Sequence, residues 1–178
     1  MKFSAVLELS PKAAMKSDIQ QLYKEIFTMK KIASFTIDHT ILPCGMYTSR
    51  VDGDIVTYDI RCRKPNVEEV MDNASIHTVE HLFATFVRNS PLSDGVIYFG
   101  PMGCRTGFYF LVRGTDVSPE QAIELTKQAF DFIASYDDEI PGVSAKECGN
   151  YRDHSLEGAK AEAARKHSQT RTSGVRPR

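Results

Sequence analysis

The segment spanning residues 76–88 constrains the fold of this chain more than any other part of it. Three polar residues, His77, Glu80 and His81, occupy positions i, i+3 and i+4 of a segment rich in apolar residues. Because successive residues of an α-helix turn by about 100°, these side chains share one face of a helix. The segment therefore predicts a helix that needs shelter on two sides, against a sheet and against a pocket or a second subunit. The apolar residues beside or opposite the polar face are Val79, Leu82, Phe83, Phe86 and Val87.

The three polar residues form an H-x-x-E-H pattern, which is typical of metal chemistry. Two imidazoles one helical turn apart can bind one divalent ion, and the neighbouring carboxylate can move a proton beside it. A lone helical histidine is more often a packed residue, but two at this spacing with the glutamate indicate a metal site. A catalytic site of this kind needs a third protein ligand and an open position. The residues alone offer Cys104, Cys148, His39 and His154 for that ligand, although His154 and His167 lie in polar sequence and are expected to be solvated.

The sequence context separates Cys104 and Cys148 from the other two cysteines. Cys148 is followed by a glycine, in a loop where the backbone can come close to an ion. Cys104 has glycines on both sides and Arg105 next to it, and a neighbouring cation favours the thiolate. Cys104 is therefore a candidate either for a ligand or for an acid/base group. Cys44 and Cys62 have no such context, and we expect them to be packing residues.

Strand and helix patterns alternate around the central helix. Asp52-Gly53-Asp54 predicts a hairpin turn, Asn73 or Ser75 is the expected cap of the central helix, and Ser118 begins a capping box. The sum is an α+β fold, a mainly antiparallel sheet packed with helices in a single domain. The expected strands are residues 33–39, 47–51, 55–61, 96–99 and 104–112, and the further helices are residues 119–135 and 155–165.

Three regions are expected along the chain. Residues 1–28 have polar flanks around a short amphipathic helix, and they precede a natural start at Met29, so we interpret them as an N-terminal appendage. Residues 29–166 form the metalloenzyme domain. Residues 167–178 are polar and basic, which predicts a disordered tail.

The composition argues against several classes of partner. The 178 residues have a formal net charge of −1, so no overall field favours nucleic acid or an anionic membrane. The chain lacks an apolar run of about 18 residues, the length that predicts a membrane span. Its 4 cysteines are widely spaced without a C-x-x-C pair, which favours reduced thiols or metal ligands and hence a cytoplasmic protein.

A series of motifs then identifies a family that the chain resembles. The run from Met29 to about Lys166 is similar to S-ribosylhomocysteine lyase, the LuxS family of bacterial enzymes. The chain departs from that pattern at Tyr98-Phe-Gly100, where a polar stretch with an Asp is expected, and at Cys62-Arg-Lys64, where an aromatic residue is expected. The matching motifs, in order, are Ser34-Phe-Thr-Ile-Asp-His-Thr40, Tyr58-Asp-Ile-Arg61 with Pro65-Asn66, Ile76-His-Thr-Val-Glu-His-Leu82, Pro101-Met-Gly-Cys-Arg-Thr-Gly-Phe-Tyr109, Cys148-Gly149 and His154-Ser-Leu-Glu-Gly-Ala-Lys160.

The resemblance implies a role for each candidate residue. The metal would be ferrous iron, replaceable by zinc or cobalt, in a homodimer with its sites at the subunit interface. The reaction would cleave S-ribosylhomocysteine to homocysteine and dihydroxypentanedione, a quorum-sensing autoinducer precursor, by carbonyl migration and β-elimination within the methyl cycle. The implied site comprises the metal ligands His77, His81 and Cys148, the acid/base pair Glu80 and Cys104, and the substrate contacts Ser34, Phe35, His39 and Arg61.

Two other functions fit the H-x-x-E-H pattern. The pattern also occurs in inverzincin metalloproteases, in which the glutamate activates water. This chain is short for that scaffold with a peptide-binding cleft, and Cys104 and Cys148 would have no role in it. A non-enzymatic metal-binding module is the second alternative. It predicts a closed shell of four protein ligands.

Overall fold

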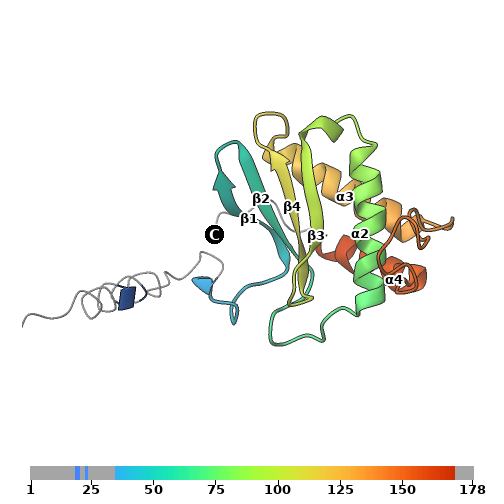
Figure 1. Cartoon of the computed structure of the whole chain (residues 1–178), viewed down its shortest axis with the longest axis horizontal. Helices are drawn as coiled ribbons and strands as arrows, with labels where there is room; N and C mark the ends of the chain where they lie inside the picture. The colour runs from blue at the N-terminus through green and yellow to red at the C-terminus, as the bar shows by residue number, and fades with distance from the viewer. Residues whose placement is uncertain (1–18, 21–22, 24–34, 171–178) are drawn as a thin grey trace, which may run out of the picture. The chain divides into compact units, whose positions relative to one another are not determined.

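The computed structural model describes residues 19–20, 23 and 35–170 (Figure 1). The chain divides into two compact units, residues 1–37 and residues 38–178. The second unit contains the sheet and three helices. In chain order its elements are β1 (Gly45–Asp52), β2 (Ile55–Arg61), α2 (Asn73–Arg88), the 3-10 turn η2 (Ser93–Gly95), β3 (Val96–Pro101), β4 (Gly107–Arg113), α3 (Pro119–Ser135) and α4 (Leu156–Thr170).

The sheet has the strand order β1-β2-β4-β3, and every neighbouring pair is antiparallel. The predicted hairpin between β1 and β2 is confirmed, with Gly53 at φ 61° in the turn. A left-handed φ suits glycine, because a Cβ is strained in that conformation. The predicted fold class, α+β with an antiparallel sheet packed with helices, is likewise confirmed. In the described part of the chain, none of the helices is long and apolar enough to cross a membrane.

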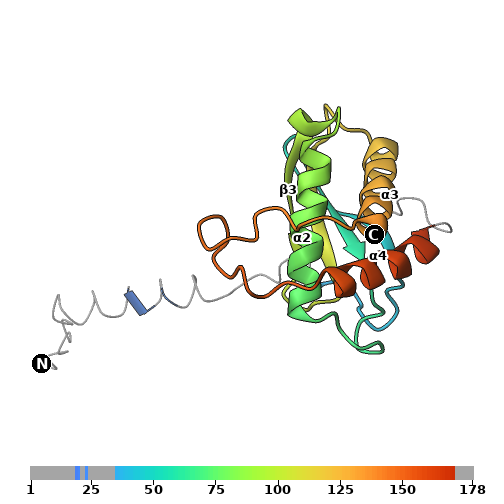
Figure 2. The same cartoon turned by 90° about the vertical axis from the view of Figure 1, so that its right-hand side faces the viewer.

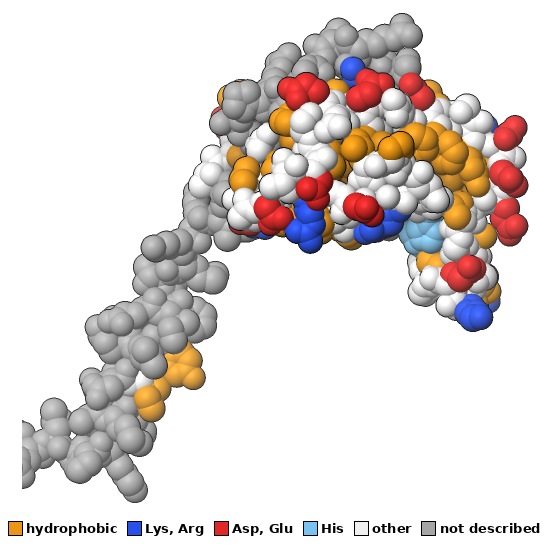
Figure 3. Space-filling view, turned by 90° about the horizontal axis from the view of Figure 1, so that it is seen from above, with side chains coloured by type: hydrophobic (Ala, Val, Ile, Leu, Met, Phe, Trp, Pro, Cys, Tyr) orange, Lys and Arg blue, Asp and Glu red, His pale blue; other side chains and the backbone are white. Residues whose placement is uncertain are grey.

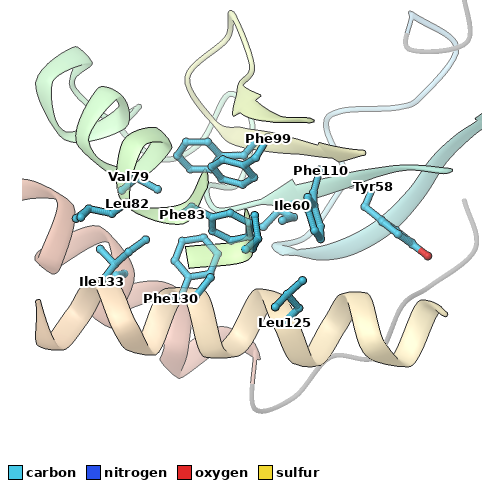
Figure 4. Close-up of a cluster of buried hydrophobic side chains, with 14 of the residues drawn as sticks. Tyr58, Ile60, Val79, Leu82, Phe83, Phe99, Phe110, Leu125, Phe130 and Ile133 are labelled. Atoms are coloured by element: carbon cyan, nitrogen blue, oxygen red, sulfur yellow. The ribbon is translucent and has the colours of Figure 1, made fainter. Parts of the chain in front are cut away.

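The helices α2, α3 and α4 lie together on one side of the sheet (Figures 1 and 2). The apolar face of α2 supplies Val79, Leu82 and Phe83, none of which is exposed. Phe83 stacks on Phe99 of β3 with ring centroids 3.7 Å apart, and it meets Phe130 of α3 edge to face (Figure 4). These contacts anchor α2 to the sheet along one face. Its polar face is therefore directed away from the core.

The central helix begins earlier than its sequence pattern predicts. It starts at Asn73, and its N-cap is Asp72 rather than Asn73 or Ser75. The Asp72 carboxylate accepts hydrogen bonds from the backbone N–H and the hydroxyl of Ser75, at 2.9 and 2.6 Å. Asn73 and Ser75 already lie within the helix, so neither can be its N-cap. The Asp72 carboxylate instead satisfies a backbone N–H of the first turn.

The strand predicted to open at Cys104 begins only at Gly107. Residues 102–106 form a turn, in which Arg105 has φ 57° and its N–H donates to the carbonyl of Met102. The carbonyl of Thr106 instead accepts from the backbone N–H groups of residues 62 and 63 beyond the end of β2. Cys104 therefore projects from a turn at the end of the sheet rather than from a strand.

Two further differences concern the ends of the domain. The strand predicted over residues 33–39 is wrong for its described part, because residues 35–40 form turns and bends. The Asp38 carboxylate accepts from the backbone N–H and hydroxyl of Thr40, a local turn that competes with a strand. Helix α4 continues past Arg165 to Thr170, so its backbone extends into the segment predicted to be a disordered tail.

Gly107 is the position where substitution should damage the sheet most directly. A Cβ there would lie 2.3 Å from the carbonyl oxygen of Ile60 and 3.1 Å from the Cα of Arg61, both backbone atoms of β2. We expect Gly107→Ala to lower the free energy of unfolding by about 1–3 kcal/mol, the usual cost of overpacking. Urea titration followed by circular dichroism measures it.

Gly103 provides the matched control for that experiment, since it lies in the turn just before Gly107 and a Cβ there meets nothing within 4 Å. Gly103→Ala should leave the free energy of unfolding within about 0.5 kcal/mol of the parent value. Equal losses in the two variants would contradict the close approach of β2 and β4 at Gly107.

Candidate metal centre

Four metal-ligating side chains from distant parts of the sequence meet beside α2. His77 and His81 come from the polar face of that helix, and Cys148 and His154 come from the connection between α3 and α4. One ligating atom of each lies within 4.8 Å of the corresponding atoms of the other three. Figure 2 shows this connection running alongside α2, and Figure 3 shows histidine surface in the angle below the main body.

The two helical histidines are oriented by backbone carbonyls. Nδ1 of His77 lies 2.9 Å from the carbonyl oxygen of Asp153, and Nδ1 of His81 lies 2.8 Å from that of Pro141. A carbonyl can only accept, so each Nδ1 carries the proton and each Nε2 carries a lone pair. Hydrogen bonds from Nδ1 to backbone carbonyls of this kind orient metal-binding histidines in known sites.

Cys148 completes a donor set suited to a divalent transition metal. Its Sγ lies 3.4 Å from Nε2 of His77, and the backbone N–H of Asn150 points to the same sulfur at 3.4 Å. The arrangement combines two imidazole nitrogens with one sulfur, the type of donor set that binds zinc or ferrous iron. The residues therefore fit the metal that the sequence predicts.

His154 was expected to be solvated, and that expectation is wrong. The residue is half-buried, and its ring stacks on His77 with centroids 3.9 Å apart and planes inclined by 23°. Its Nδ1 lies 3.1 Å from Oγ1 of Thr78, whose hydroxyl proton goes to the carbonyl of Ala74. Nδ1 of His154 is therefore the donor in that pair, and Nε2 carries the lone pair. This Nε2 is buried and has no hydrogen-bond partner among the described residues.

The stacking of His154 on His77 argues against a fourth ligand. An imidazole binds a metal with the ion in its ring plane, and two planes stacked at 3.9 Å do not meet at bonding distance. The planes of His77 and His81, by contrast, are inclined by 89°, so their lone pairs can converge. His154 thus covers one side of His77, and His77, His81 and Cys148 are the three residues that would hold an ion.

Glu80 is half-buried on the same face of α2 as the two histidines. Burial raises the pKa of its carboxyl group above the usual range, and the charges of His77 and His81 oppose that rise only in part. A carboxyl group with a raised pKa holds a proton more readily near neutral pH, which suits a group that must take and return protons.

A cavity of about 570 Å³ opens beside these residues, and this volume suits a metabolite. It is lined by Glu80, the metal-ligand candidates His77, His81 and Cys148, and Tyr98 of β3. Burial and the nearby Glu80 carboxylate raise the pKa of the Tyr98 phenol, so it stays a hydrogen-bond donor at neutral pH. Tyr98 thus forms part of the wall of the cavity, in the segment where the sequence was expected to depart from the family pattern.

A second cluster surrounds Cys104 at the end of β2 and β4. Arg61, predicted to contact substrate, is buried, and its Nη2 donates to the carboxylate of Asp59 at 2.6 Å. Its Nη1 lies 3.7 Å from Sγ of Cys104 and 2.5 Å from Oγ1 of Thr106. The structure thus brings Arg61 to Cys104, and neither of them is among the residues that line the cavity.

The remaining predicted contacts lie before β1. His39 is half-buried in a turn and does not line the cavity. Phe35 is exposed and belongs to the N-terminal unit, residues 1–37. Ser34 lies outside the described residues, as does most of the predicted helix within residues 1–28.

Sequence reasoning missed Thr106 and Tyr98 at these sites, and it offered His154 only as one of four possible third ligands. His154 and Thr106 lie within motifs already assigned to the family, so their place in those motifs was the available signal. Nothing in their periodicity indicated a role, because neither lies on a regular face of a helix or strand.

Comparison with known proteins agrees with this arrangement. The family model described as S-ribosylhomocysteinase (LuxS) matches residues 32–175. The chain is 47% identical over 142 residues to S-ribosylhomocysteine lyase of Borreliella burgdorferi (strain ZS7), an alignment covering 77% of this chain and 90% of the relative. It is 52% identical over 136 residues to the enzyme of that name from Finegoldia magna, covering 74% and 86%. For the enzyme of that name from Phocaeicola vulgatus, the identity is 48% over 142 residues, covering 77% and 88%. By the extent of the family match and the level of these identities, the chain belongs to the S-ribosylhomocysteinase (LuxS) family.

Proposed function

We propose that this protein is a metal-dependent S-ribosylhomocysteine lyase that releases homocysteine and dihydroxypentanedione. The observation that carries the proposal is the convergence of two oriented Nε2 atoms and the Cys148 sulfur beside Glu80, in a cavity of metabolite size. The activity is that named for its relatives, which share about half of their aligned residues with it.

The ligand set that we propose is His77, His81 and Cys148, with ferrous iron as the ion and zinc or cobalt as substitutes. A divalent ion in this position acidifies C–H bonds next to a carbonyl group and stabilises negative charge on its oxygen. His154 is left outside the set because its ring stacks on His77. No oxidant or organic cofactor is required.

Glu80, beside the metal ligands, and Cys104, in the cluster at the end of β2 and β4, are the proposed acid/base pair. The opened ribose carries an aldehyde, and successive proton transfers between neighbouring carbons and oxygens move the carbonyl along the chain. When the carbonyl lies next to the carbon that must lose its proton, removal of that proton expels the homocysteine sulfur. Each proton transfer leaves the overall oxidation state of the substrate unchanged. Two proton carriers with shifted pKa values, Glu80 raised and Cys104 lowered, suit this sequence.

The active form in this proposal is a cytoplasmic homodimer with its sites at the subunit interface. Its substrate contacts are Ser34, Phe35, His39 and Arg61. Support for a reducing compartment comes from the spacing of the 4 cysteines, which lie far apart in the sequence without a C-x-x-C pair. The proposed product is a quorum-sensing autoinducer precursor, and the proposed reaction belongs to the methyl cycle.

A structural metal module is the second candidate, because a fourth donor residue, His154, lies in the cluster. A closed shell of four ligands would exclude exchangeable water, whereas the proposed enzyme keeps an open position. Substitution with Co²⁺ separates them. A catalytic site changes its visible spectrum on adding substrate, and a closed site does not. The metalloprotease alternative predicts caseinolysis by the same preparation.

Replacement of Glu80 tests the proposed chemistry. Protein purified anaerobically with its metal should release free thiol from S-ribosylhomocysteine, measured with a thiol reagent. Glu80→Gln should keep its metal content and lose at least about 10²-fold in the rate of release, because the amide cannot carry a proton. Glu69→Gln, at an exposed glutamate outside the cavity, is the matched control and should match the parent rate. Full activity in Glu80→Gln would reject the assigned role.

A further inference from the structure

Thr106 places a buried hydroxyl between a cation and the thiol of the proposed acid/base pair. Its side chain is 4% exposed, and its Oγ1 lies 2.5 Å from Nη1 of Arg61 and 3.0 Å from Sγ of Cys104. The guanidinium also reaches Cys104 directly, at 3.7 Å. The three groups therefore form a closed triangle at the end of β2 and β4.

The directions of these hydrogen bonds follow from the groups themselves. A guanidinium has only donors, so Oγ1 of Thr106 accepts from Arg61. The hydroxyl proton is then directed to the Cys104 sulfur, which is its remaining neighbour among the described residues. The sulfur is thus the acceptor in this pair, and the Arg61 guanidinium 3.7 Å from it favours its thiolate form.

The backbone holds Thr106 in this place. Its carbonyl accepts from the N–H groups of Cys62 and Arg63, at 2.9 and 3.0 Å. Arg105, at φ 57°, turns the chain between Cys104 and Thr106 so that both side chains approach Arg61. The hydroxyl is therefore fixed before any substrate arrives, as a pre-organised donor must be.

Arg61 is equally constrained. Its Nη2 donates to the carboxylate of Asp59 at 2.6 Å, and both side chains are buried. Asp59 thus prevents the guanidinium from rotating away from Thr106. Among the described residues, the charged groups at this end of the sheet include Arg61 and Asp59 of β2, Arg63 just beyond it, and Arg105 of the turn.

We propose that Thr106 is a positioning residue that donates its hydroxyl proton to Cys104, and so keeps that sulfur as an oriented thiolate. This proposal rests on the proposed function only where it gives the thiolate a part in the lyase reaction. The thiolate itself can be measured without turnover. Partial burial raises the pKa of Cys104. The Thr106 hydrogen bonds and the Arg61 charge outweigh that effect, so the pKa lies below the usual value.

The test is the pH dependence of Cys104 alkylation by iodoacetamide in the metal-loaded full chain, followed on each cysteine peptide by mass spectrometry. Thr106→Val keeps the shape of the side chain and removes the hydroxyl. Alkylation of Cys104 at neutral pH should slow by about tenfold, with its midpoint moved to higher pH, because one charge-assisted hydrogen bond is lost. Metal content should not change.

Two controls separate the effect of the Thr106 hydroxyl from the effect of side-chain packing. Thr106→Ser retains a hydroxyl and should restore the alkylation profile. Thr126→Val removes another buried hydroxyl, which donates to the carbonyl of Ala122 in α3, and should leave Cys104 unaffected. If Thr106→Val has the parent midpoint, or if Thr106→Ser does not restore it, the positioning role is wrong.

A second measurement tests the proposal even if Thr106→Val does not fold. In the unaltered protein, Cys104 should alkylate with a midpoint below that of an ordinary thiol, and an ordinary midpoint would overturn the proposal. Thiol release from S-ribosylhomocysteine then tests the consequence for turnover: kcat of Thr106→Val should fall, with the acid side of its pH profile moved upward. If the unaltered protein has no lyase activity, the proposed function fails while the alkylation result still decides the role of Thr106.

Discussion

Replacing His81 with alanine should empty the metal site. Two ligands would remain, His77 and Cys148, and a catalytic ion is normally held by three protein ligands. The loss should exceed the roughly 10–100-fold fall in affinity that follows removal of a group that merely orients a ligand. Metal analysis of protein purified anaerobically should show almost no bound ion, where the parent protein binds one per chain.

Two further histidine variants make this result specific. His39→Ala removes a histidine outside the cluster and should keep its metal. His154→Phe keeps a ring to stack on His77 and removes the lone pair, so it should also keep its metal. Full metal content in His81→Ala would reject the ligand set. Loss of metal in His154→Phe would instead make His154 a fourth ligand and favour a structural site.

Much of the fold was predictable because it depends on short-range patterns. The alternation of residues 47–51 and 55–61 around Gly53 determines the hairpin, and the capping box at Ser118 determines the start of α3. In both cases the residues that decide the element lie within a few positions of it. The cap of α2 was not predictable in the same way, because Asp72, Asn73 and Ser75 are all good caps and only the path of the preceding chain selects among them.

The start of β4 illustrates a limit of periodicity. Residues 104–112 alternate as a strand would, yet the carbonyl of Thr106 is taken by N–H groups beyond β2. That contact joins segments more than forty positions apart, and a period-2 pattern contains no information about it. The same contact is what brings Thr106 to Arg61, so the residue missed at this site and the misplaced strand boundary have one cause.

In the metal cluster, too, some residues could be predicted from their spacing in the sequence and others could not. His77 and His81 share a helical face, so their proximity follows from their spacing. Cys148 reaches them from an irregular connection, and from the residues alone it was only one of four candidates until the family resemblance selected it. His154 lies 76 positions from Thr78, the residue that orients it, and its polar surroundings in sequence give no indication of burial. Its position could come only from the folded structure.

The two cysteines of the proposed site should respond oppositely to removal of their sulfur. Cys148→Ala should lose metal and activity together, because Cys148 lies 3.4 Å from Nε2 of His77 within the ligand cluster. Cys104→Ala should keep its metal and its fold while losing nearly all thiol release, because Cys104 contacts Arg61 and Thr106 instead. Loss of a positioned acid/base group costs about 10²–10⁴ in rate, and the upper end is expected where the thiolate is already formed.

Metal analysis, a thermal melt and the thiol-release assay on the same preparations decide the outcome, with Cys44→Ala as the matched control. Cys44 is half-buried near Glu68 and belongs to neither cluster, and its removal should change neither metal content nor rate. If Cys104→Ala loses the ion and Cys148→Ala retains it, the two thiols have exchanged roles, and the ligand must come from the turn between β3 and β4.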